Sequence, residues 1–119
     1  MALQGTFNAD NLIAGDFPIV TEAVTIDTGV LARGTVLGKI TASGKCVICD
    51  SAGTDDGRRA PYAVLLEAVD ATSADVAAAA ALTGEFNRAK LVFGGTDTYA
   101  THVVAMRDLC MFQKAAQPA

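Results

Sequence analysis

Short runs of apolar and β-branched residues, each closed by a turn signal, recur along the chain from Ala23 onward. Runs of this length and spacing are typical of the strands of a small sheet or barrel. They predict strands at residues 23–27, 35–41, 45–50 and 63–69. The Ser43-Gly44 pair between the second and third runs predicts a β-hairpin.

The run from Val76 to Leu82 has two interpretations. Its five consecutive alanines favour a helix, which Ser73 or Asp75 could cap. However, Gly84 follows closely, and a helix this short is only marginally stable. Intrinsic propensity, taken alone, predicts a helix here rather than a strand.

The clearest helix prediction lies near the C-terminus. Gly94-Gly95 breaks the preceding pattern, and Thr96 or Asp97 can serve as the N-cap. Apolar residues then recur at helical spacing and form one predicted stripe: Tyr99, Val103, Met106 and Cys110. Residues 109–112 favour a final strand after this helix.

Residues 1–20 differ from the rest of the chain because their large hydrophobic residues follow no helical or strand period. These residues, with one proline, are Leu3, Phe7, Leu12, Ile13, Phe17 and Pro18. The pattern fits an arm that becomes ordered against a partner, or an extended segment wrapped around its own domain. The chain therefore divides into an arm at 1–20, a body at 21–114 and a flexible tail at 115–119.

Composition limits the possible functions. The chain has 119 residues, enough for one domain, and its net charge of −4 argues against binding nucleic acid through phosphate contacts. The longest apolar run, residues 76–82, is too short to span a membrane, and the N-terminus lacks a signal-peptide pattern. We expect a protein made in the cytoplasm with reduced thiols. Much of its 51% apolar content is alanine, so we expect other chains to cover part of its surface.

Cys46 and Cys49 have the spacing of a zinc knuckle or a dithiol redox pair. Zinc needs four ligands, and only Cys110 and His102 remain as further candidates of these types. In a strand, residues three positions apart point to opposite faces, so we expect both thiols to pack as small hydrophobic groups. A small thiol-redox or metal-binding protein that uses Cys46 and Cys49 remains the alternative.

The other candidates for chemistry are weak. His102 is the only histidine, and no nucleophile motif accompanies it. Asp55 and Asp56 lie beside Arg58 and Arg59 in a polar loop, which predicts a solvated turn with local ion pairs. We therefore expect no enzyme, no cofactor and no metal site.

Three stretches in order carry a family resemblance. They are Arg33-Gly-Thr-Val-Leu-Gly-Lys-Ile with the Ser43-Gly44 turn, Pro61-Tyr-Ala-Val-Leu-Leu-Glu-Ala-Val-Asp, and Leu82-Thr-Gly-Glu-Phe-Asn. The first alone is similar to parts of biotinyl and lipoyl domains, but their modified lysine motif is missing. In combination, the stretches resemble the head decoration protein family of tailed phages, of the phage lambda decoration protein D type. The resemblance runs from about Ala23 to about Lys114.

This resemblance implies an α+β, mainly β fold: a small β-barrel-like sheet with one main C-terminal helix and an extended N-terminal arm. It makes residues 76–82 a strand, against their alanine propensity. It also implies a non-enzymatic homotrimer on the virion, made in the host cytoplasm. Its partner would be the major capsid protein. The trimer would bind at threefold and quasi-threefold sites on the outside of the mature head and would stabilise the head against DNA pressure.

The implied capsid contact maps onto the arm at 1–20, with no role for nucleic acid or membrane. In this family the arm is mobile in the free protein and adds a strand to capsid elements when bound. A barrel domain that binds other proteins outside any virion is a third possibility, besides the thiol-based alternative.

Overall fold

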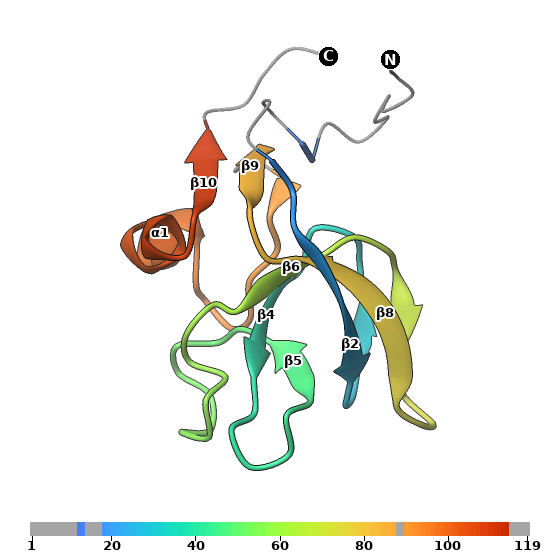
Figure 1. Ribbon diagram of the computed structural model, residues 1–119. Helices are drawn as coiled ribbons and strands as arrows, with labels where there is room; N and C mark the ends of the chain where they lie inside the picture. Colours follow the sequence, from blue (N-terminus) through green and yellow to red (C-terminus); the bar gives the residue numbers. More distant parts are fainter. Residues whose placement is uncertain (1–11, 14–17, 88–89, 115–119) are drawn as a thin grey trace, which may run out of the picture.

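The computed structural model describes residues 12–13, 18–87 and 90–114. Five strands close a barrel in the order β2-β5-β4-β6-β8 (Figure 1). Their bounds are β2 Thr21–Ile26, β4 Val36–Lys39, β5 Cys46–Ile48, β6 Ala63–Leu65 and β8 Val76–Ala81. In the described part of the chain, one C-terminal α-helix lies beside the barrel, which confirms the mainly β class and the barrel-like sheet.

The alanine-rich run forms strand β8. It pairs antiparallel with β2 along its whole length, from Thr21 opposite Ala81 to Ile26 opposite Val76. Ala78 and Ala80 are buried while Ala77 and Ala79 are exposed, which is the period of a strand. The helix favoured by alanine propensity is therefore wrong, and the strand implied by the family resemblance is confirmed. A full ladder with β2 outweighs the local preference.

Strands β4 and β5 form the predicted hairpin, with Leu37 opposite Ile48 and Lys39 opposite Cys46. Gly44 in the connecting turn has φ +75°, a conformation that L side chains rarely adopt. Gly38 is required for a different reason, which is the close approach of another backbone segment: an added Cβ would lie 2.5 Å from the carbonyl oxygen of Arg58. The polar loop that contains Arg58 thus packs directly against β4.

The predicted strand at residues 63–69 is two strands. After β6, Leu66 donates its N–H to the carbonyl of Ala79, and the N–H of Ala79 then bonds the Glu67 side chain at 2.8 Å. The chain leaves the barrel at this point. Strand β7 (Val69–Asp70) instead pairs antiparallel with β3 (Val30–Leu31). Glu67 is the residue in the predicted run that departs from the apolar pattern, and the break falls there, between β6 and β7.

The last elements form a second layer next to the barrel. Strand β9 (Gly84–Asn87) pairs in parallel with β10 (Met111–Lys114), and helix α1 (Tyr99–Asp108) leads into β10. Figure 1 shows α1 beside β10 at one side of the barrel. The final strand is therefore present as expected, two residues later than predicted.

Helix α1 differs from its prediction in two respects. Its N-cap is Thr98, whose N–H bonds the Thr101 side chain at 3.1 Å, rather than Thr96 or Asp97. Its buried residues are His102 and Met106, and Val103 is half-buried, so the predicted stripe is wrong at Tyr99 and Cys110. Tyr99 is 38% exposed and Cys110 is exposed. The helix therefore meets the body through apolar packing of Met106 and through the buried polar contact of His102.

The core has two clusters on opposite faces of the barrel sheet. The first, which we call the barrel cluster, consists of Val24, Ile26, Leu31, Leu37, Cys46, Ala63, Leu65, Val69, Ala71, Ala78 and Ala80. The second, which we call the helix cluster, consists of Leu12, Val36, Cys49, Val64, Ala81, Phe86, Met106 and Met111. Neighbouring residues in one strand, such as Val36 and Leu37, enter different clusters, as the alternation of a strand requires.

Candidate functional site

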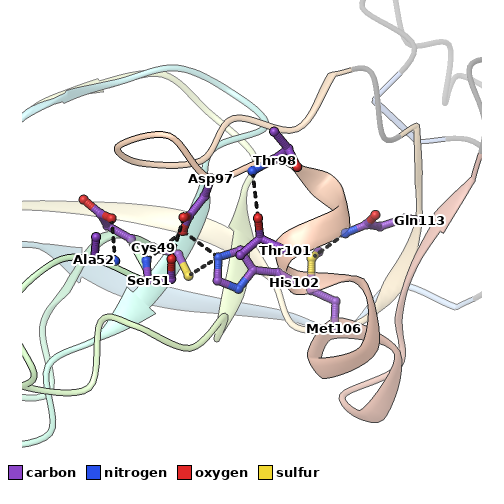
Figure 2. A network of polar contacts seen from close by, with 10 residues as sticks. Cys49, Ser51, Ala52, Asp97, Thr98, Thr101, His102, Met106 and Gln113 are labelled. Atoms are coloured by element: carbon purple, nitrogen blue, oxygen red, sulfur yellow. Dashed lines mark hydrogen bonds and ion pairs between the residues drawn. The ribbon is translucent and has the colours of Figure 1, made fainter.

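A buried polar network joins helix α1 to the end of β5 (Figure 2). The Nε2 atom of His102 lies 2.8 Å from Oδ2 of Asp97, and both side chains are almost inaccessible. Asp97 also accepts hydrogen bonds from the backbone N–H and the hydroxyl of Ser51. The ring of Phe93 stacks on His102 with the centroids 5.2 Å apart. The network thus fixes the start of α1 against the barrel.

Sequence reasoning missed the carboxylate partner of His102. It treated Asp97 only as a possible helix cap, and it assigned no role to Ser51. The structure instead brings Ser51 and Asp97 together from positions 46 residues apart. A local sequence pattern cannot predict a contact between residues so far apart. For the Asp97–His102 contact, the one hint in the sequence was that an acidic residue stands five positions before the only histidine.

The network does not have the geometry of a nucleophilic site. The Sγ atom of Cys49 lies 3.7 Å from Nε2 of His102, the same ring nitrogen that contacts Asp97. In a nucleophile–base–acid arrangement the two partners use different ring nitrogens. Burial, with smaller effects of Asp97 and Asp50, also raises the pKa of Cys49 to about 12, which keeps the thiol protonated. The arrangement therefore suits a structural role, in which the network holds α1 against the chain that follows β5.

Cys46 and Cys49 point to opposite faces of the sheet, as their strand spacing predicts. Cys46 belongs to the barrel cluster and Cys49 to the helix cluster. Burial raises the pKa of Cys46 to about 11, the opposite of what a reactive thiol needs. In the part of the chain that the structure describes, no group of three or more His, Cys, Asp or Glu side chains could hold a metal ion. The thiol-based alternative thus receives no support from this geometry.

The charged loop contains the local ion pair that was expected. Arg58 donates from Nη2 to Oδ2 of Asp56 at 2.8 Å and from Nε to Oδ1 at 3.0 Å. These hydrogen bonds lower the pKa of Asp56. Arg59 donates to the carbonyl of Gly53 at 2.9 Å. The two arginines therefore order the loop that covers Gly38.

Three of the six residues proposed for the arm lie in the described part of the chain: Leu12, Ile13 and Pro18. Leu3, Phe7 and Phe17 lie outside the described residues. Leu12 is fully buried in the helix cluster, and Ile13 is half-buried at an antiparallel bridge to Phe86. Pro18 is exposed, and its carbonyl accepts a hydrogen bond from the Thr83 hydroxyl at 2.8 Å.

A comparison with protein-family models gives one decisive result. The model described as "Bacteriophage lambda head decoration protein D" matches residues 2–114. The chain belongs to this family. The match includes almost all of the N-terminal segment as well as the body, and it agrees with the family resemblance of the sequence. A comparison with curated proteins gave no match.

For a head decoration protein, the exposed apolar surfaces are the places where other chains can bind. An open groove of about 430 Å³ lies over β3 and β7, and Val30 at its edge is 70% exposed. On α1, Val104 is 62% exposed, and Leu109 after the helix is 45% exposed. Among the described residues, no helix has the length and apolar character required to cross a membrane.

Proposed function

We propose that this protein is a non-enzymatic capsid decoration protein that binds the outside of the mature phage head and stabilises it against DNA pressure. The observation that carries the proposal is the family match over residues 2–114. The partner is the major capsid protein, and the binding positions are threefold and quasi-threefold sites. The protein is made in the host cytoplasm and ends on the outer surface of the virion.

The proposed binding unit is a homotrimer. A closed threefold arrangement presents three identical arms to three equivalent positions of the shell. The exposed apolar side chains of Val30, Val104 and Leu109 support the idea that further chains cover part of the body. Linking three weak contacts through one rigid unit raises avidity by about 10² to 10⁴ without a new type of contact.

The proposed capsid-binding segment is the arm at residues 1–20, attached to a body at 21–114 that is followed by a tail at 115–119. Its proposed contacts are Leu3, Phe7, Ile13, Phe17 and Pro18, whereas Leu12, the sixth residue predicted for the arm, is buried in the helix cluster. Addition of an extended segment to a capsid strand uses main-chain hydrogen bonds, which tolerate varied side chains. This tolerance suits quasi-equivalent sites, where the surroundings of each arm differ.

The direct test adds the purified protein to expanded, undecorated capsids of its phage and images them by cryo-electron microscopy. We expect density of three copies at threefold and quasi-threefold sites. Empty sites at saturating protein would contradict the proposed function. Sedimentation of the free protein tests the trimer separately, because a strict monomer at high concentration would contradict it.

A further inference from the structure

We propose that Leu12 is a positioning residue, which fastens the arm to the body so that residues 1–11 reach the capsid from a fixed point. The inference rests on the proposed capsid-binding function. It divides the arm into a segment that remains with the body and a segment that is available to the partner. The argument uses the contacts of Leu12, its neighbours and Pro18.

The side chain of Leu12 is part of the hydrophobic core. It has 0% exposure and packs in the helix cluster with Phe86, Met106 and Met111. The space around it is closely filled, since a Cβ added to Gly34 would lie 3.4 Å from Cδ1 of Leu12. A leucine at this position cannot fill a capsid pocket unless it first leaves the core.

The backbone is held at the same point. The N–H of Asn87 donates to the carbonyl of Leu12 at 2.8 Å, and Ile13 forms an antiparallel bridge with Phe86. Phe86 also pairs with Gln113 of β10, and a strand residue has one neighbour on each edge. Leu12 and Ile13 therefore occupy the edge of β9 that β10 leaves open.

A second attachment follows closely along the chain. The Thr83 hydroxyl bonds both the carbonyl of Pro18 and the N–H of Val20, at 2.8 and 3.0 Å. The carbonyl of Val20 in turn accepts the N–H of Leu82 at 2.6 Å. The arm is thus fastened before and after residues 14–17, and Leu12 is the attachment nearer to the N-terminus.

This position sets the reach of the arm. Eleven residues, 1–11, span at most about 40 Å when fully extended. If Leu12 were released, the nearest attachment would be Pro18, and the tether from Phe7 would lengthen from five residues to eleven. Effective concentration falls with roughly the −3/2 power of tether length, which gives about a threefold loss per arm and about thirtyfold for three arms. Leu12 therefore strengthens capsid binding without touching the capsid.

The test combines capsid binding with hydrogen–deuterium exchange on the full-length protein. In the wild type, we expect the amide of Asn87 to be protected both in the free protein and on the capsid. Leu12→Ala should remove this protection, leave the β2–β8 amides protected and weaken capsid binding about thirtyfold. Thr25→Ala is the control, because its side chain is exposed on β2, outside the arm, and it should bind like the wild type.

Two results would overturn the inference alone. One is loss of Asn87 protection when the wild type binds the capsid, which would show that Leu12 is released rather than retained. The other is full-strength binding by Leu12→Ala with an unprotected Asn87. The wild-type exchange measurement decides the question even if Leu12→Ala fails to fold. Failure of the wild type to bind capsids would instead overturn the proposed function, and the inference with it.

Discussion

His102 and Asp97 form a buried pair, with Nε2 and Oδ2 2.8 Å apart, that connects the first turn of α1 to the loop before it. Through Ser51, the pair also reaches the chain just after β5. Helix α1 buries only one further side chain, Met106. Because α1 buries so few side chains, we expect its polar attachment to contribute measurably to stability.

Removing the carboxylate should therefore destabilise the protein measurably. Asp97→Ala leaves His102 and the Ser51 N–H without their acceptor, and we expect a loss of about 2 kcal/mol in the free energy of unfolding. Urea unfolding at one fixed protein concentration measures it. Asp108→Ala, at an exposed position of the same helix, is the control and should change stability by less than about 0.5 kcal/mol. Equal effects of the two variants would contradict the fastening role.

The same pair predicts a dependence on acid. Hydrogen bonds from Ser51, followed by those of His102, lower the pKa of Asp97 below its ordinary value of 3.8. As the pH falls, Asp97 is therefore protonated in the unfolded state before it is protonated in the folded state. The contribution of Asp97 to folding stability is present above pH 3.8 and is lost as the pH falls through the folded-state pKa. Asp97→Asn should remove this slope.

The measurement is the difference in unfolding free energy between wild type and Asp97→Asn, followed from pH 5 downward. Asp56 and Asp70 also have lowered pKa values, but both proteins contain them, so their effects cancel in the difference. A difference that stays constant as the pH falls would show that Asp97 has no such linkage.

Much of the barrel could be predicted from the sequence, because its strands alternate locally. The hairpin at Ser43-Gly44 and the opposite orientation of Cys46 and Cys49 both follow from the two-residue period of a strand. Strand β8 was ambiguous for a physical reason. Alanine prefers a helix in isolation, and only the ladder with β2, from a segment about 55 residues away, makes it a strand.

The features that could not be predicted are contacts between distant segments. Ser51 holds Asp97, the hydrogen-bond partner of His102, in place. Leu12 likewise packs against Phe86 and Met111, which lie far from it in the sequence. The segment before β2 has no period, so its sequence left two interpretations open: a partner-binding arm or a wrapped extension. At Leu12 and Ile13 the structure shows contact with the body, while the capsid contact of the arm remains a proposal.

The thiols give a simple chemical test of the barrel. Cys46 and Cys49 are buried, with pKa values raised to about 11 and about 12, whereas Cys110 is exposed. In the native protein at pH 8, we expect a disulfide reagent to modify one thiol per chain quickly, and three after unfolding. Cys110→Ser should abolish the fast phase. Fast reaction of the remaining thiols in this variant would contradict their placement in the two clusters.

Two truncations separate the role of the arm from that of its attachment. Deletion of residues 2–11 keeps Leu12, so the body should unfold with nearly wild-type stability while capsid binding is lost. Deletion of residues 2–13 also removes Leu12 from the helix cluster, and loss of a buried leucine costs about 2–5 kcal/mol. Thermal unfolding at matched concentration and capsid co-sedimentation measure the two effects. Full-strength capsid binding by the first truncation would contradict the assignment of the arm, whereas equal stability of the two truncations would contradict the burial of Leu12.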